Sequence, residues 1–359
     1  MSDLKLLPRA IGVLEPPWRG RLGEYPRALV WSPAGDRLLT GDAAGTLTCF
    51  ESRTGAVAWS VQAHADGILD LAVHPREARL ASAGQDGRGR LWDLDGRASP
   101  RTLDADAAWV EHLAWSPAGD RLASASGRHV RFWTPEGELI SRTPAHASAV
   151  SALAWCGQAE LASACYGGLS FWDPAGGALR ERLDWKGALI SLAISPDGAI
   201  VAGGSQDRTV HFWRRLTAED SMMSGYPGKP AALAFDSSAR LLATSGAEYT
   251  TVWNFGGAGP EGSTPGLLEG HSEPITHLAF AHRGPRLATG AADAFVLVWD
   301  LDGDGQGRLV GAAPATGPVE RLAWRGDDRA LAAIDAAGGV TVWHCAGALP
   351  SKRAADAAV

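Results

Sequence analysis

The stretch Leu80–Asp93, LASAGQDGRGRLWD, decides the fold, because its closing Leu-Trp-Asp recurs along the chain. A second copy of the pattern, LATGAADAFVLVWD, runs from Leu287 to Asp300. An aromatic residue stands at the same place in every unit, at Phe50, Trp92, Trp133, Trp172, Trp213, Trp253, Trp299 and Trp343. Successive members of this series are 42, 41, 39, 41, 40, 46 and 44 residues apart. The chain is therefore one long array of repeats.

Each unit alternates apolar and polar residues over short runs bounded by Gly, Pro, Asp or Ser, as in GRHVRFW and DRTVHFW. Alternation at period two predicts strands, and a repeat of about forty residues made of short strands predicts the blades of a β-propeller. Eight three-stranded units begin near Ala28, Ile68, Val110, Val150, Leu189, Ala231, Ile275 and Val319. The prediction is an all-β, eight-bladed propeller, or a seven-bladed one if the first unit, which ends in Phe50, forms no full blade.

The last unit is followed only by HCAGALPSKRAADAAV, which has little apolar periodicity. We therefore expect the last blade to lack its own outer strand, and the N-terminal segment Leu4–Leu14 to supply it and close the ring. Residues 1–350 are predicted to form one domain and residues 351–359 a disordered tail. The Gly- and Pro-rich segment Phe255–Gly270 predicts an extended loop.

Composition narrows the classes of function. The net charge is −7 with no run of five like charges, so the sequence lacks the basic footprint of a nucleic-acid-binding protein. No charged leader followed by an apolar core is present, and no apolar stretch reaches about 18 residues, so we expect a cytoplasmic protein. The four cysteines form no Cys-x-x-Cys pair, which favours reduced thiols over a zinc ribbon or a disulfide framework.

The units resemble the WD40 family, in which an apolar strand such as LAWSPAGD (Leu113–Asp120) is followed by a second strand, a tight turn and a third strand ending in Trp. The resemblance covers about residues 20 to 345. It implies that two sets with identical spacings form hydrogen-bonded networks inside single blades, at His64, Ser82, Asp86 and Trp92 and at His271, Thr289, Asp293 and Trp299. Their composition is that of a hydrolase triad, but the repetition argues for a structural role.

Other units depart from this pattern. The position of the network histidine holds Leu22, His64, Asp106, His146, Trp185, Tyr226, His271 and Ala315 in turn. Units three, four and six are also one residue shorter between their second and third strands, which places Arg128, Tyr166 and Glu248 near that turn. In WD40 proteins these turns form the top face around the central channel, so the departures of units three to six are expected to cluster there.

The predicted partner-binding site consists of Trp109, Cys165, Tyr166, Trp185, Lys186, Gln206, Tyr226 and Lys229. Aromatic residues with a few basic and amide groups have the composition of a protein-binding hot spot. The alternative is that Trp185 and Tyr226 only fill the space left by the missing histidine.

A metal site has weaker support. Neither His271, His277 and His282 nor the pair His344 and Cys345 has a carboxylate partner in a suitable arrangement. However, DAAWVEHLAWSP, ACYGGLSFWDP, WKGALISLAISPDG, QDRTVHFW and MSGYPGKPAALAF resemble a bacterial WD40 subgroup often encoded beside CobW-type metallochaperone GTPases. That resemblance implies a link to metal homeostasis.

Three functions follow from these observations. The leading hypothesis is a non-enzymatic, monomeric ring without a cofactor that binds a protein or peptide through the top face of blades three to six. The second is a metal-homeostasis accessory protein that binds zinc or docks a CobW-type metallochaperone. The third is an enzyme at the channel mouth, which is disfavoured because Asp70, Glu111 and Glu320 are the main acidic exceptions among apolar or small residues at the start of the inner strands.

Overall fold

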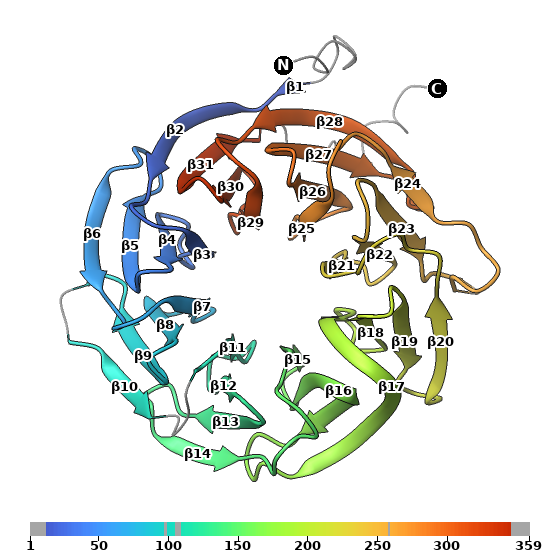
Figure 1. Ribbon diagram of the computed structural model, residues 1–359, viewed down its shortest axis with the longest axis horizontal. Helices are drawn as coiled ribbons and strands as arrows, with labels where there is room; N and C mark the ends of the chain where they lie inside the picture. The colour runs from blue at the N-terminus through green and yellow to red at the C-terminus, as the bar shows by residue number, and fades with distance from the viewer. Residues whose placement is uncertain (1–11, 97–98, 105–108, 258, 346–359) are drawn as a thin grey trace, which may run out of the picture.

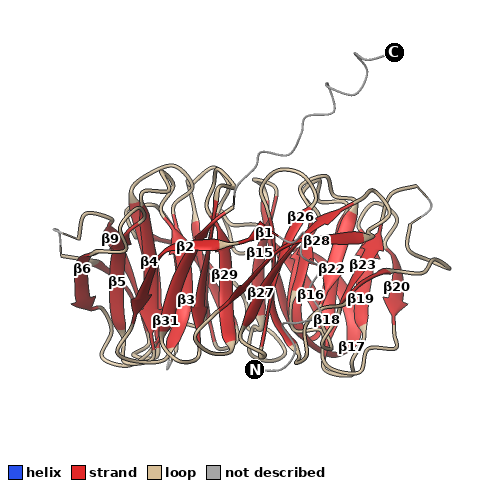
Figure 2. Ribbon diagram, turned by 90° about the horizontal axis from the view of Figure 1, so that it is seen from above, coloured by secondary structure: helices blue, strands red, loops and turns tan. Residues whose placement is uncertain are grey.

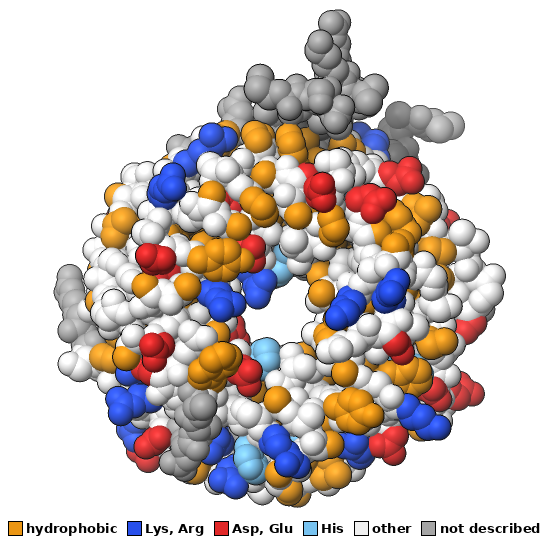
Figure 3. Space-filling view, in the orientation of Figure 1, with side chains coloured by type: hydrophobic (Ala, Val, Ile, Leu, Met, Phe, Trp, Pro, Cys, Tyr) orange, Lys and Arg blue, Asp and Glu red, His pale blue; other side chains and the backbone are white. Residues whose placement is uncertain are grey.

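The computed structural model describes residues 12–96, 99–104, 109–257 and 259–345, and within them every regular element is a β-strand. The sheets stand radially in a ring, with the first strand of each unit innermost and the last on the circumference (Figure 1). From the side the ring is a flat disc (Figure 2), and a channel opens at its centre (Figure 3). No helix long and apolar enough to cross a membrane occurs in the described ranges. The predicted tail, residues 351–359, lies outside them.

The strands form seven hydrogen-bonded sheets, numbered here in chain order. Sheet 1 contains β3 (Pro26–Trp31), β4 (Arg37–Asp42), β5 (Thr46–Glu51) and β6 (Val57–Gln62). Sheet 2 contains β7 (Ile68–Val73), β8 (Arg79–Gly84), β9 (Arg88–Asp93) and β10 (Arg101–Asp104). Sheet 3 contains β11 (His112–Trp115), β12 (Leu122–Ser126), β13 (His129–Trp133) and β14 (Leu139–Arg142).

Sheet 4 has six strands, β15 (Ala152–Cys156), β16 (Glu160–Trp172), β17 (Leu179–Ile194), β18 (Ile200–Ser205), β19 (Val210–Arg214) and β20 (Glu219–Met223). Sheet 5 contains β21 (Leu233–Phe235), β22 (Leu241–Thr244), β23 (Thr250–Asn254) and β24 (Gly266–Leu268). Sheet 6 contains β25 (Ile275–Phe280), β26 (Arg286–Ala291), β27 (Phe295–Leu301), β28 (Gly307–Pro314) and β1 (Gly12–Val13). Sheet 7 contains β29 (Val319–Trp324), β30 (Ala330–Asp335), β31 (Gly339–His344) and β2 (Glu15–Arg21).

The prediction of eight separate blades is therefore wrong, because units four and five share the long strand β17. Its first half is the outer strand of unit four, where Leu183 pairs with Leu169, and its second half is the inner strand of unit five, where Leu192 pairs with Gly203. The sequence LDWKGALISLAI contains no proline or turn pair that would end the strand between these halves. Extended backbone therefore runs directly from one unit into the next.

A glycine and an arginine hold this fused sheet together. Gly168 has φ +124°, and a Cβ there would lie 2.1 Å from the Leu183 carbonyl oxygen, so only glycine allows β16 to bend this closely against β17. On the opposite edge, the Arg215 guanidinium donates to Glu160 Oε1 at 2.5 Å and to Glu181 Oε2 at 2.6 Å. These charge-assisted bonds tie unit five to unit four.

The N-terminal strand that joins the last sheet is β2, which pairs antiparallel with β31. It starts after the predicted segment Leu4–Leu14, most of which lies outside the described residues. Trp18 on β2 is buried, stacks on Phe50 of sheet 1 with ring centroids 5.7 Å apart, and donates its indole N–H to the Ser52 carbonyl at 2.8 Å. The strand thus contacts the first sheet as well as the last.

Tryptophans on the inner strands connect neighbouring sheets. In four sheets the indole N–H donates to a carbonyl on the inner strand of the preceding sheet, at about the same height. The pairs are Trp31 with Ala323 at 2.9 Å, Trp115 with Ala72 at 3.1 Å, Trp155 with Ala114 at 3.0 Å and Trp324 with Ala279 at 2.9 Å. Apolar side chains fill the space between sheets, so the core is a series of layers around the channel.

The segment Phe255–Gly270, predicted to be a loop, contains the strand β24, and the described connection between β23 and β24 covers residues 255–257 and 259–265. Arg214 of sheet 4 donates to both carboxylate oxygens of Glu261 in this loop, at 2.5 and 2.8 Å. The loop is thereby attached to the neighbouring sheet.

Candidate functional site

Antiparallel pairing gives the ring two distinct faces. The turns between second and third strands, and the chain leading into each inner strand, lie at one edge of every sheet, which we call the upper face. The turns between first and second strands, and between third and fourth strands, lie at the other edge, the lower face. Figure 3 shows one face, on which hydrophobic side chains are scattered among acidic and basic ones around the channel mouth.

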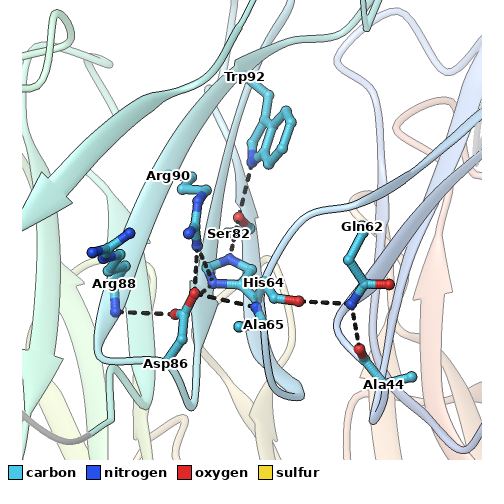
Figure 4. Close-up of polar contacts among 9 residues, drawn as sticks. All are labelled: Ala44, Gln62, His64, Ala65, Ser82, Asp86, Arg88, Arg90 and Trp92. Carbon is cyan, nitrogen blue, oxygen red and sulfur yellow. Dashed lines mark hydrogen bonds and ion pairs between the residues drawn. The ribbon is translucent and has the colours of Figure 1, made fainter.

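In sheet 2 hydrogen bonds connect all four residues of the first predicted network (Figure 4). His64 Nδ1 lies 2.8 Å from Asp86 Oδ1, His64 Nε2 lies 2.8 Å from Ser82 Oγ, and Trp92 donates its indole N–H to Ser82 Oγ at 2.9 Å. Arg90 also donates to Asp86, at 2.8 Å. Burial lowers the pKa of His64, while the bonds from His64 and Arg90 outweigh burial and lower the pKa of Asp86. Ser82 is fully buried, so its hydroxyl is structural.

Sheet 6 contains the second predicted network. His271 contacts Thr289 Oγ1 at 2.8 Å and Asp293 Oδ2 at 3.0 Å, and Trp299 donates to Thr289 at 3.2 Å. Burial alone would raise the pKa of Asp293, but His271 and the backbone amides of Ser272 and Phe295 together outweigh burial and lower that pKa below its usual value. Both sets satisfy their buried polar atoms within one sheet.

A third network uses only part of the pattern. His146 Nε2 lies 2.7 Å from Ser163 Oγ, to which Trp172 also donates at 2.7 Å. The backbone carbonyl of Arg128, 2.8 Å from His146 Nδ1, takes the place of the aspartate. A backbone group thus compensates for the short turn of this unit, which the sequence pattern did not reveal.

Tyr226 replaces the histidine of sheet 5. Its side chain is buried, its hydroxyl lies 2.9 Å from Thr244 Oγ1, and Trp253 donates its indole N–H to that hydroxyl at 3.0 Å. The phenol hydroxyl therefore lies between threonine and tryptophan, whereas in sheets 2 and 6 the Ser or Thr hydroxyl lies between histidine and tryptophan. Tyr226 therefore fills the position of the histidine and is buried, so its side chain offers little surface to a partner.

Trp185 fills the same position in the second half of sheet 4 without forming such a network. Its ring stacks on His211 with centroids 4.0 Å apart, and its indole N–H has no hydrogen-bond partner among the described residues. His211 is 2% exposed, and its Nε2 lies 2.9 Å from Asp220 Oδ2 but outside hydrogen-bonding alignment. Gly203 stands where sheets 2 and 6 carry the network hydroxyl, so aromatic stacking replaces hydrogen bonding here. The Trp185 side chain is therefore half-buried and packs within the sheet, which leaves little of it exposed.

The remaining predicted residues lie on the upper face. Trp109, just before β11, is 49% exposed, and Tyr166, at the bend of β16, is 58% exposed. Lys186, Gln206 and Lys229 are exposed. Cys165 is 1% exposed, so it cannot contact a partner directly and is also removed from the predicted site.

Sheet 4 brings part of this set together. Tyr166 pairs with Ala188 across the β16–β17 ladder, and the backbone N–H of Gln206 donates to the Ala188 carbonyl at 3.0 Å. Tyr166 and Gln206 therefore flank one residue of β17, and Lys186 precedes that residue by two positions. Trp109 belongs to the neighbouring sheet 3 and is anchored by Ser126, whose hydroxyl donates to the Trp109 carbonyl at 2.5 Å.

The acidic and imidazole groups on the inner strands serve the ring itself. Asp70 accepts hydrogen bonds from the Leu71 and Leu113 amides, both at 2.8 Å, which joins sheet 2 to sheet 3. Burial raises the pKa of Asp70 to about 6. Burial, together with Arg321, lowers the pKa of His277 to about 3. Within the described ranges no three His, Cys, Asp or Glu side chains are placed to hold a metal ion.

Comparison with known proteins finds the same repeat and the same fold elsewhere. The family model for the WD domain, G-beta repeat, matches residues 55–93, 98–134, 182–214 and 262–300. These stretches of the chain are WD40 repeats. The crystal structure of the computationally designed Ika8 protein is similar to this WD40 propeller in fold, with a TM-score of 0.76 and 24% identity, and covers 90% of this chain and 98% of its own.

Curated relatives of this WD40 chain are similar over part of their length. Telomerase protein component 1 of Mus musculus is 23% identical over 74% of this chain and 10% of its own. The anaphase-promoting complex subunit cdc20 of Dictyostelium discoideum is 24% identical over 55% of this chain and 50% of its own. The probable cytosolic iron-sulfur protein assembly protein 1 of Mycosarcoma maydis is 30% identical over 60% of this chain and 38% of its own. The chain thus spans from a tenth to half of these relatives.

Proposed function

We propose that this propeller is a non-enzymatic scaffold that binds a protein or peptide on the upper face of sheets 3 and 4. The observation that carries the proposal is the exposure of Trp109 and Tyr166, at 49% and 58%, on turns where the fold needs no aromatic side chain. Large rigid aromatic side chains gain much buried area for little lost rotamer entropy, and they dominate many protein interfaces. Lys186, Gln206 and Lys229 supply polar groups around them.

Two further observations support a scaffold over an enzyme. The His, Ser or Thr and Asp groups of sheets 2 and 6 are occupied with one another and buried, so they are not available as acid, base or nucleophile. In addition, two relatives are named as parts of larger assemblies, a component of telomerase and a subunit of the anaphase-promoting complex.

A partner involved in metal homeostasis is the second candidate. It rests on the resemblance to WD40 proteins encoded beside CobW-type metallochaperones, and one relative is named as an iron-sulfur protein assembly protein. In this version the upper face docks the GTPase, and any zinc in the complex belongs to the partner.

The test is affinity capture from the native host, followed by binding measurements with each purified candidate. The variant W109A/Y166A is compared with V57A/L139A, which removes two side chains of 56% and 54% exposure from outer strands. We expect the first variant to weaken binding by about 30-fold or more and the control to bind like wild type. A metallochaperone among the partners lost with W109A/Y166A would select the second candidate. Equal affinity of both variants would refute the proposed face.

A further inference from the structure

The lower face carries a hollow that the proposed function does not use. Its volume is about 570 Å³, and it lies where turns of sheets 6, 7 and 1 meet. The β3–β4 turn at residues 33–37 and the β5–β6 turn at residues 51–53 form one wall, and Arg283 and residues 325–327 form the other. A second hollow of about 290 Å³ shares the β3–β4 turn and continues toward Arg76. Ring closure creates this site, because its walls come from opposite ends of the chain.

The hollow has four arginines and three carboxylates, and each carboxylate already has a partner. Glu51 Oε1 lies 3.5 Å from Arg37. Asp327 receives two hydrogen bonds from Arg325, both at 2.8 Å, and Asp36 accepts one from the Ser32 hydroxyl at 2.8 Å. These acids are therefore engaged within the walls.

Arg325 forms a rigid part of the wall. Its side chain lies flat against Gly35, where φ is +68° and a Cβ would come within 2.8 Å of Arg325 Cγ and Cδ. Its third nitrogen donates to Ser52 Oγ at 3.4 Å. Glycine at position 35 thus permits both the turn and the close approach of the arginine, and the guanidinium is held before any ligand arrives.

Arg53 and Arg283 are different. Both are exposed, both line the hollow, and within the described ranges neither guanidinium has a carboxylate or hydrogen-bond partner. The Arg283 amide donates to Asp328 Oδ2 at 3.0 Å, which fixes its backbone beside the turn that carries Arg325. Two unpaired guanidinium groups therefore face one concave space on a protein whose net charge is −7.

We propose that this hollow binds a small phosphorylated molecule, with Arg53 and Arg283 gripping its phosphate oxygens. Each guanidinium presents parallel N–H donors that match two oxygens of a phosphate, and such charge-assisted pairs are among the stronger hydrogen bonds in proteins. The volume is within the range of small-ligand pockets, so the ligand is a metabolite rather than a folded domain. The site is separate from the upper face, and its occupancy does not depend on the protein partner.

The test is isothermal titration calorimetry of the full chain with pyrophosphate as the probe, and with citrate to represent carboxylate ligands. The variant R53A/R283A is compared with R19A/R308A, which removes the same charge from exposed positions on outer strands. We expect pyrophosphate to bind at one site, and R53A/R283A to weaken it by about 30-fold or more while R19A/R308A binds like wild type.

Three results would overturn the proposal. The first is the absence of saturable pyrophosphate binding to wild type at low ionic strength. The second is an equal loss in both variants, which would mean that total charge rather than the hollow governs binding. The third is tighter binding of citrate than of pyrophosphate, which would assign the hollow to carboxylates.

Discussion

Replacing Tyr226 by phenylalanine tests whether a tyrosine takes the place of the network histidine in sheet 5. The substitution keeps the ring and removes one oxygen, which lies 2.9 Å from Thr244 Oγ1 and accepts the Trp253 indole N–H at 3.0 Å. Thr244 retains Thr251 as a neighbour, but the indole N–H loses its acceptor. An orphaned buried donor costs about 1–3 kcal/mol, so Y226F should lower the free energy of unfolding by that amount.

The assay is urea unfolding followed by tryptophan fluorescence and circular dichroism, with a thermal melt as a second measurement. For a chain of 359 residues the expected loss corresponds to a fall in Tm of roughly 1–4 °C. Y166F is the matched control, because it removes the same atom from a side chain that is 58% exposed, and it should stay within about 0.5 kcal/mol of wild type. If Y226F is as stable as wild type, or if Y166F loses as much, the Tyr226 hydroxyl is not a structural hydrogen-bonding centre.

Three other substitutions probe the ring. Burial and Arg321 hold the pKa of His277 at about 3, so between pH 6 and pH 3 this imidazole takes up a proton only in the unfolded chain. H277Q should therefore flatten the pH dependence of the free energy of unfolding by about 1.4 kcal/mol per pH unit in this range, measured by urea melts at pH 6 and pH 4. R215A should cost about 1–3 kcal/mol in urea melts at pH 7, because it leaves the Glu160 and Glu181 carboxylates without their charge-assisted partner. G168A should cost at least about 2 kcal/mol in thermal and urea melts, whereas G127A, at φ +52° with open space around it, should cost about 1 kcal/mol.

The strand order and the closing tryptophans could be predicted from the sequence, because they depend on local alternation and on a spacing that repeats. That two units share the strand β17 could not be predicted from this spacing. Its signal was present, since Leu179–Ile194 lacks a strong turn signal, but the period of the array suggests a boundary there. A continuous strand and a turn give the same spacing between tryptophans, and only the pairing of Tyr166 with Ala188 separates them.

The residues of the candidate site were predicted from their positions in the repeat. The structure shows that some of their side chains are buried and others exposed. The repeat alignment shows that Trp185 and Tyr226 stand in the histidine position, but it carries no information on whether the side chain turns inward. Trp109 and Tyr166 remain exposed because neither stands in that position. The hollow around Arg53 was missed altogether, since its walls come from turns of three sheets that only ring closure brings together.

The distribution of complete networks shows where the surface is free to vary. Sheets 2 and 6, which keep the complete His, Ser or Thr, Asp and Trp sets, have their upper turns fixed by aspartates that bond backbone amides, as Asp293 bonds Ser272 and Phe295. In sheet 3 and in the first half of sheet 4 the turn aspartate is absent, and the turns carry exposed side chains instead. A turn that no longer has to hold an aspartate over a histidine can present an aromatic residue to solvent. For this reason we expect binding specificity to reside on sheets 3 and 4, and the turns of sheets 2 and 6, which hold the complete networks, to tolerate little change.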